Sequence, residues 1–193
     1  MKTLPDATAL AQNLVNTGEL NGVKTCAFVT DMSQPLGAYI GNALEIFEIE
    51  CLLQNRFPHK EDEALCTDTL ELSLRLAGAM IFFAGKASTF EFGYAKAKEI
   101  LATGQAWEKF QDMVRAHGGN LGKRPWPQHQ SIVAAPETGF IAELDVETIG
   151  LAAILLKAGR LRSEDKLDFT SGIKLLKKIG DRVEKGEPLF IVY

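Results

Sequence analysis

The sequence lacks the clustered cysteines that a disulfide framework or a zinc site requires. Cys26, Cys51 and Cys66 are widely spaced among 193 residues, no CxxC pair is present, and the three histidines stand apart from them. Structural zinc takes closely spaced cysteine and histidine ligands, and disulfide scaffolds carry dense, even sets of cysteines. We therefore expect three reduced thiols, with neither a zinc site nor a disulfide.

Long apolar runs and an excess of positive charge are also absent. The longest apolar stretch, residues 72–84, contains Arg75 and is too short to cross a bilayer, so it predicts a buried helix. The net charge of −4 argues against a nucleic-acid surface, which needs a basic excess. The first residues turn polar at once and carry no apolar signal region. The expectation is a cytoplasmic protein with no membrane and no nucleic-acid partner.

The motifs of several enzyme classes are missing as well. The chain has no GxGxxG, no P-loop, no GxSxG and no HExxH, and no histidine stands at motif spacing from a nucleophile. The best candidate from the residues alone is Asp31, which follows a predicted strand, since ligands of open α/β sheets bind outside the carboxyl ends of strands. The alternative is that Asp31 and Ser33 only shape a turn and cap the next helix.

The spacing of apolar residues predicts an α/β segment up to about residue 120. A helix over 5–18 precedes a β-branched run, 23–30, typical of a strand buried on both faces of a parallel sheet. A helix with Glu45 and Glu48 on the face opposite its apolar residues is expected next. Further helices are expected over about 60–84, from a capping box at 88–91 to 104, and from 106 to an end at Gly118-Gly119.

A small α+β domain is expected from about 130 to 193. The proline-containing stretch 122–130 has no periodicity and indicates a linker. Asp145 is placed to cap a helix that reaches Leu156. The chain stops inside the apolar run LFIVY, which suggests a truncation or a sheet completed at its edge. Short strands are expected over 131–135, 140–144, 169–176 and 189–193, with turns at 180–183 and 185–188.

The turn pattern from Gly180 to Leu189, Gly-x-x-Val-x-x-Gly-x-Pro-Leu, is similar to that of the hammerhead folds of biotinyl and lipoyl carrier domains. Those carriers modify a lysine at an exposed hairpin. Lys174, Lys177 and Lys178 do not form that motif. We therefore expect hammerhead-like strands in a structural role and no carrier function.

Two groups of segments resemble one family, the pyrimidine nucleoside and thymidine phosphorylases. TDMSQPLG at 30–37 and GNALE at 41–45 are similar to the family's TDM-x-QPLG…GNALE segment. The resemblance covers nearly the whole chain. It implies that residues 1–120 are the C-terminal part of the α/β catalytic domain and that residues 130–193 are the α+β C-terminal domain. The later matching residues are AELD at 142–145, Gly150, Gly159-Arg160, Asp168, Gly172-Ile173 and GDRVEKGEPL at 180–189.

The resemblance implies a pentosyltransferase. Family members cleave thymidine, deoxyuridine or uridine with phosphate as co-substrate, and they release the free base and the sugar 1-phosphate. The transition state has oxocarbenium character, so catalysis depends on placing phosphate below the sugar and on stabilising the leaving base. The active site lies in a cleft between a helical and an α/β domain of a homodimer, so a homo-oligomer is expected.

The family's phosphate-binding and base-binding residues are absent from this chain. The Lys-Ser/Thr-Gly-Gly run and the Arg…Ser…Lys set both precede the matched region, so no catalytic residue is carried over. The chain alone is expected to be inactive, with its own missing N-terminal half as a partner. One alternative is a non-catalytic structural or binding module derived from the family. Another is a close relative such as an AMP phosphorylase or a phosphoribosyltransferase, which the TDM-x-QPLG segment disfavours.

The resemblance carries over part of one ion site. Some bacterial members bind structural K⁺ or Ca²⁺ through positions that match the backbone carbonyls of Leu36 and Tyr39 and the carboxylate of Glu48. Hard cations take such oxygen ligands. The family usually has Tyr-Ala where this chain has Ala38-Tyr39, a swap that carbonyl ligation tolerates. The remaining ligands lie in the absent phosphate loop, and the alternative is that Glu48 is a solvated helix carboxylate.

Overall fold

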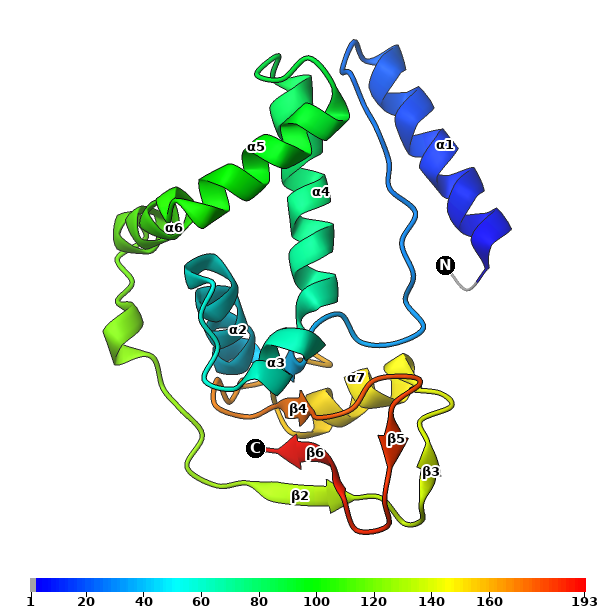
Figure 1. The fold of residues 1–193 in the computed structure, drawn as a ribbon, viewed down its shortest axis with the longest axis vertical. Coiled ribbons are helices and arrows are strands. Elements are labelled where there is room, and N and C mark those ends of the chain that lie inside the picture. Colours follow the sequence, from blue (N-terminus) through cyan, green and yellow to red (C-terminus); the bar gives the residue numbers. More distant parts are fainter. Residues whose placement is uncertain (1–2) are drawn as a thin grey trace. The chain divides into compact units, whose positions relative to one another are not determined.

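The computed structural model describes residues 3–193, which divide into two compact units at the junction of Met32 and Ser33 (Figure 1). The first unit holds one helix, α1 (Leu4–Leu20). Thr3 caps it by accepting a hydrogen bond from the Asp6 N–H, and a proline stands in its first turn. The helix predicted over 5–18 is therefore confirmed. None of its residues is buried, and Leu20 is 88% exposed.

The strand predicted over 23–30 is wrong for this structure. Residues 23–30 are extended but lie outside any strand, and Val23 is 58% exposed. A strand of a parallel sheet needs hydrogen-bonded neighbours on its edges. The described residues of the first unit, 3–32, contain no strand that could supply them.

The second unit holds the remaining elements, among them two small antiparallel sheets. A mixed α/β fold was expected and is confirmed at this level. In chain order the elements are β1 (Tyr39–Ile40), α2 (Asn42–Gln54), α3 (Lys60–Leu65), α4 (Thr67–Phe83), α5 (Phe90–Ala102), α6 (Gln105–Ala116), the 3-10 turn η1 (Leu121–Lys123), β2 (Ser131–Ala134), β3 (Gly139–Phe140), α7 (Val146–Leu155), β4 (Ile173–Leu175), β5 (Arg182–Val183) and β6 (Pro188–Val192).

The helical part differs from the expectation in three details. The helix predicted over 60–84 is divided at the buried Cys66 into α3 and α4, and α5 is capped by Thr89 rather than Ser88, with its side chain accepting from the Phe92 N–H. The expectation of a buried helix over 72–84 is wrong for one face, because Met80 is 73% exposed. The buried face of α4 includes Gly78, which packs against α5.

The larger sheet joins the two predicted domains. Its strand order is β1-β4-β6-β2, and all its pairs are antiparallel. Tyr39 of β1 is opposite Lys174 of β4, so a strand from the predicted α/β segment forms the edge of a sheet built by the C-terminal residues. A second sheet pairs β3 with β5. The strands predicted over 140–144 and 169–176 are shorter than expected, and β5 lies where a turn was predicted.

Helix α7 packs against β4 (Figure 1). Ala153 of α7 packs with Ile173 and Leu175 of β4 in one hydrophobic cluster. Asp145 caps the helix by accepting from the Thr148 N–H, as predicted. Burial of this apolar face holds β4 in place. Lys178, which follows β4, then reaches the loop that follows residue 33.

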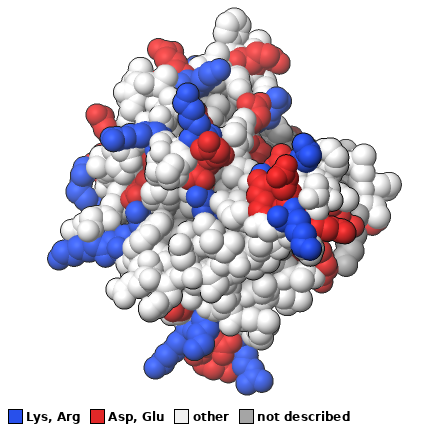
Figure 2. All heavy atoms as spheres, turned by 60° about the horizontal axis from the view of Figure 1, so that its bottom comes forward, with Lys and Arg blue, Asp and Glu red and all other residues white. Residues whose placement is uncertain are grey.

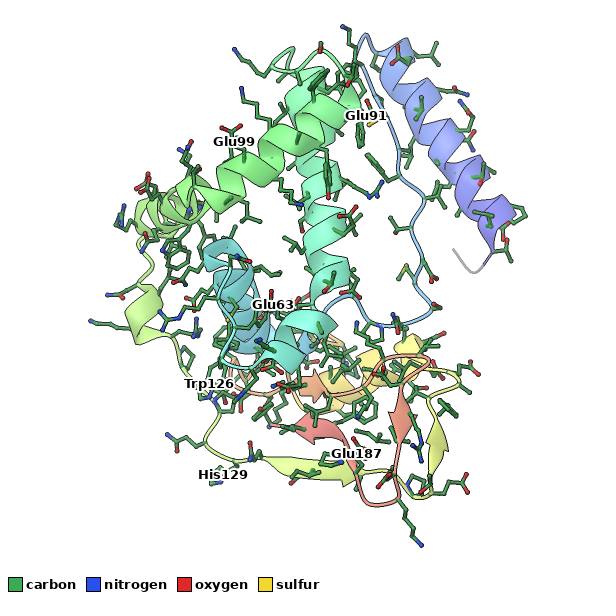
Figure 3. The ribbon with its side chains drawn as sticks, in the orientation of Figure 1. Glu63, Glu91, Glu99, Trp126, His129 and Glu187 are labelled. Carbon is green, nitrogen blue, oxygen red and sulfur yellow. The ribbon has the colours of Figure 1, made fainter. Side chains whose placement is uncertain are left out.

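The predicted linker is held against α2. The Arg124 guanidinium pairs with Glu50 and lies 5.7 Å from the Phe47 ring centroid and 5.5 Å from that of Trp126. Trp126, labelled in Figure 3, in turn contacts Phe47 edge-on at 5.1 Å. Cation–π and aromatic contacts of this kind hold an extended segment that has no β-sheet hydrogen bonds to hold it. The domain boundary expected between 120 and 130 stays a prediction.

No helix within residues 3–193 is long and apolar enough to cross a membrane. In Figure 2 acidic and basic side chains lie beside one another in the upper part of the drawn face and at its bottom edge, and a broad area without charged residues lies between them.

Candidate functional site

The carboxylate of Glu48, in α2, holds the loop that connects Ser33 to β1. Its Oε2 accepts hydrogen bonds from the consecutive N–H groups of Ala38 and Tyr39, each at 3.0 Å, and its Oε1 accepts from the Thr69 hydroxyl at 2.9 Å. The side chain is only 5% exposed. The alternative that Glu48 is a solvated helix carboxylate is therefore wrong, because three donors replace the water that burial removes.

Gly37 allows this carboxylate to approach the loop. Its φ is +70°, and a Cβ at this position would lie 2.1 Å from Glu48 Oε1. Only glycine combines that backbone conformation with so close a contact. The arrangement makes Glu48 an ordered hydrogen-bond acceptor for the loop rather than an available general base.

The C-terminal residues hold the same loop from another side. Lys178 Nζ donates to the Pro35 carbonyl at 2.6 Å and lies 2.9 Å from Asp68 Oδ2. Asp68 Oδ1 accepts the Gly37 N–H at 3.1 Å. One carboxylate thus bridges a lysine that follows β4 to the backbone of the loop. The loop's Gln34 also accepts from the Ile179 N–H, at 3.0 Å.

A second pair, which is buried, joins β4 to α3. Lys174 Nζ lies 2.6 Å from Asp62 Oδ1, and the Tyr39 hydroxyl donates to Asp62 Oδ2 at 3.1 Å. Lys174 Nζ is also 5.1 Å from the centroid of the Tyr39 ring. Burial, with the negative Asp62 as a further cause, raises the pKa of Tyr39, so its hydroxyl stays a proton donor.

The three predicted ion ligands lie in this loop and beside it. Tyr39 and Glu48 are brought together by the N–H···Oε2 bond, and Leu36, whose carbonyl was predicted as a ligand, belongs to the same loop and is 50% exposed. Among residues 3–193 no group of three or more His, Cys, Asp or Glu could hold a metal ion. The ion site stays a prediction.

Asp31, the other sequence candidate, belongs to the first unit. It is exposed and lies outside any helix or strand, and Ser33, which is also exposed, opens the second unit. A position at the carboxyl end of a sheet strand was the basis of its prediction. Since residues 23–30 form no strand here, its role in ligand binding stays a prediction.

Sequence reasoning missed Asp62, Asp68, Lys174 and Lys178. Lys174 and Lys178 were considered only as carrier lysines. A signal for Lys174 exists, because it alternates with the buried Ile173 and Leu175 in β4 and so points to the other face of the sheet. Nothing local pairs it with Asp62, which lies on a helix far away in sequence.

A separate apolar cavity of about 570 Å³ lies between α2, α6 and residues 119–125. Phe110 and Met113 of α6, Ile46 of α2 and Phe169 line it, and none of the predicted ion ligands does. It is therefore distinct from the Glu48 loop.

Two family models match the chain. Residues 1–107 match the model described as the a/b domain of the glycosyl transferase family, and residues 140–193 match the pyrimidine nucleoside phosphorylase C-terminal domain. The chain belongs to the pyrimidine nucleoside phosphorylase family. The resemblance predicted from TDMSQPLG and GNALE is confirmed.

The curated relatives of this family member include enzymes from two bacteria. The chain is 42% identical to the pyrimidine-nucleoside phosphorylase of Bacillus subtilis strain 168 and 40% identical to that of Staphylococcus aureus strain USA300. Each alignment covers 100% of this chain and 44% of the relative. The chain therefore spans less than half the length of the curated relatives it matches.

Proposed function

We propose that this chain is the C-terminal part of a pentosyltransferase that cleaves thymidine or uridine with phosphate. The observation that carries the proposal is the 42% identity, over the whole chain, to a protein named pyrimidine-nucleoside phosphorylase. In the proposed reaction a phosphate oxygen bonds to the anomeric carbon, the carbon–nitrogen bond breaks, and its electron pair leaves with the base. The products are the free pyrimidine and the sugar 1-phosphate.

The chain supplies the scaffold of this enzyme and needs a complementing N-terminal segment for turnover. Its first unit supports this, because α1 buries none of its residues and its Leu4, Leu14 and Leu20 are 69%, 58% and 88% exposed. Apolar side chains so exposed favour association with another surface. A segment with further strands would also supply the sheet that residues 23–30 lack. Homo-oligomerisation through that segment is part of the proposal.

The proposal includes three finer points. The domain boundary lies within residues 120–130, and the strands around Gly180–Leu189 have a hammerhead-like arrangement.

A K⁺ or Ca²⁺ ion binds the carbonyls of Leu36 and Tyr39 and the carboxylate of Glu48, with the remaining ligands from the complementing segment. The buried, ordered Glu48 supports this site. Isothermal titration with either ion should detect binding only in the complemented protein, and Glu48→Gln should abolish it.

A phosphorolysis assay tests the main proposal. The purified chain is incubated with thymidine or uridine at varied phosphate, alone and with the N-terminal segment of the Bacillus subtilis relative. We expect no base release by the chain alone and phosphate-dependent release by the mixture. Release by the chain alone would contradict the absence of a catalytic apparatus. No release by a mixture that demonstrably associates would favour the non-catalytic module.

A further inference from the structure

The loop of residues 34–39 is held by groups from two parts of the chain that are distant in sequence. Glu48 secures it from the helical side by accepting the Ala38 and Tyr39 N–H groups, and the Thr69 hydroxyl in turn donates to Glu48. The segment after β4 secures it from the C-terminal side. The two sets bind on either side of Gly37, at Pro35 and at Ala38 and Tyr39, so the conformation at Gly37 depends on both.

Lys178 is the central group on the C-terminal side. Its Nζ donates to the Pro35 carbonyl and pairs with Asp68, whose other oxygen accepts the Gly37 N–H. The Lys178 side chain is 12% exposed, and that of Asp68 is 34% exposed. A partly buried charge-assisted network orders the groups it joins more strongly than an exposed ion pair does.

The network ends at the candidate site. Gly37 lies between Asp68, which accepts its N–H, and Glu48, whose Oε1 would be 2.1 Å from a Cβ built on it. A shift of the Gly37 backbone therefore has to move the Glu48 carboxylate or break its bonds to Ala38 and Tyr39. Lys178 has no bond to Glu48 itself among those described and acts through the loop.

We propose that Lys178 is a positioning residue, through which the C-terminal domain fixes the 34–39 loop against Glu48 and so sets the geometry of the proposed phosphorolysis site. Its effect on turnover depends on the proposed function, whereas its effect on the loop does not. The chain offers a matched control in Lys177, which has the same charge but pairs with Glu187 at 2.6 Å. Glu187, labelled in Figure 3, belongs to the turn before β6.

The first arm of the test measures amide hydrogen exchange in the 193-residue chain and in its Lys178→Met, Lys178→Arg and Lys177→Met variants. We expect Lys178→Met to speed exchange at Gly37 by about tenfold, the change that the loss of one charged hydrogen bond gives. Exchange at Ala38 and Tyr39 should rise with it. Lys178→Arg, which keeps a charged donor, should restore part of the protection, and Lys177→Met should leave it unchanged. Equal exchange in Lys178→Met and Lys177→Met overturns the proposal.

The second arm measures phosphorolysis by each variant mixed with the N-terminal segment, at a temperature where circular dichroism shows every variant folded. Lys178→Met should lower kcat/KM by about tenfold or more, since small misplacements of site geometry have effects of that size. A merely structural role would lower the melting temperature and leave kcat/KM of the folded enzyme unchanged, which would overturn the positioning role. If the wild-type mixture is inactive, the proposed function fails, and the exchange arm still decides whether Lys178 fixes the loop.

Discussion

Lys174 Nζ lies 2.6 Å from Asp62 Oδ1, and the two side chains are only 12% and 5% exposed. Replacement of Lys174 by Met would leave a buried carboxylate with the Tyr39 hydroxyl as its remaining described donor. We expect the free energy of unfolding to fall by about 3 kcal/mol, because removal of one partner leaves an uncompensated buried charge. Urea unfolding followed by circular dichroism measures the change.

Two controls separate the buried pair from a general loss of charge. Lys177→Met breaks a more exposed pair, with Glu187 at 35% exposure, and should cost less than about 1 kcal/mol. The double variant Lys174→Met/Asp62→Asn should lose less than the sum of its single changes, because the buried charge is gone. A loss in Lys174→Met as small as that in Lys177→Met would contradict the prediction.

The crossing of α4 and α5 depends on two glycines. A Cβ at Gly93 would lie 2.3 Å from the Gly78 carbonyl oxygen, so the helix backbones approach too closely for a side chain. Gly93→Ala should lower the free energy of unfolding by about 1–3 kcal/mol, the usual cost of overpacking. Gly150→Ala in α7, where a Cβ meets nothing within 4 Å, should raise it by about 0.5–1 kcal/mol. Equal changes in melting temperature would refute a steric role for Gly93.

The sequence predicted features that depend on neighbouring residues better than features that depend on residues far apart in the chain. Asp145 was predicted to cap a helix from neighbouring residues, and it does so. Glu48 was assigned to the solvent face of its helix, although it follows Leu44 by four residues and precedes Cys51 by three, which places it on their buried stripe. The helical spacing alone would have predicted that Glu48 is buried, but its charge led to the opposite interpretation.

Other features could not be predicted from the neighbouring residues in the sequence. Residues 23–30 have the composition of a buried strand, but a strand forms only where other strands provide hydrogen bonds, and residues 3–32 hold none. Lys178 and Asp68 are joined across more than a hundred residues, so no spacing pattern predicts their pair. The family resemblance pointed to the loop that contains Leu36 and Tyr39 but did not identify what holds it.

Gly37 and Gly186 both have positive φ, +70° and +85°, but only Gly37 is crowded. Alanine should cost about 1–2 kcal/mol at either position because of the left-handed backbone. Gly37→Ala should cost at least about 1 kcal/mol more, since its Cβ would displace the Glu48 carboxylate and leave buried N–H groups unpaired. Urea unfolding compares the two variants, and equal losses would show that the contact with Glu48 is not important for stability.

The three thiols differ in accessibility. Cys26 is exposed, and Cys51 and Cys66 are buried. Burial raises the pKa of Cys51 from 9.0 to about 11, and burial together with the negative Glu48 raises the pKa of Cys66. The thiolate is the reactive form, so iodoacetamide at pH 8 should modify Cys26 alone in the folded chain and all three after unfolding in urea. Peptide mass spectrometry reports the sites, and rapid modification of Cys66 in the folded chain would contradict its burial.

The same buried groups predict a loss of stability at alkaline pH. Cys51, Cys66 and Tyr39 all have pKa values raised in the folded state, chiefly by burial. Below their ordinary pKa values both states are protonated, and the stability they contribute is fully present. As the pH rises above about 9, the unfolded chain loses protons that the folded chain retains, so the free energy of unfolding falls. Urea unfolding at a series of pH values from 8 to 11 should show this decline. Because Cys51 titrates within this window, Cys51→Ala should make the decline shallower, and an identical slope in the variant would show that another group causes it.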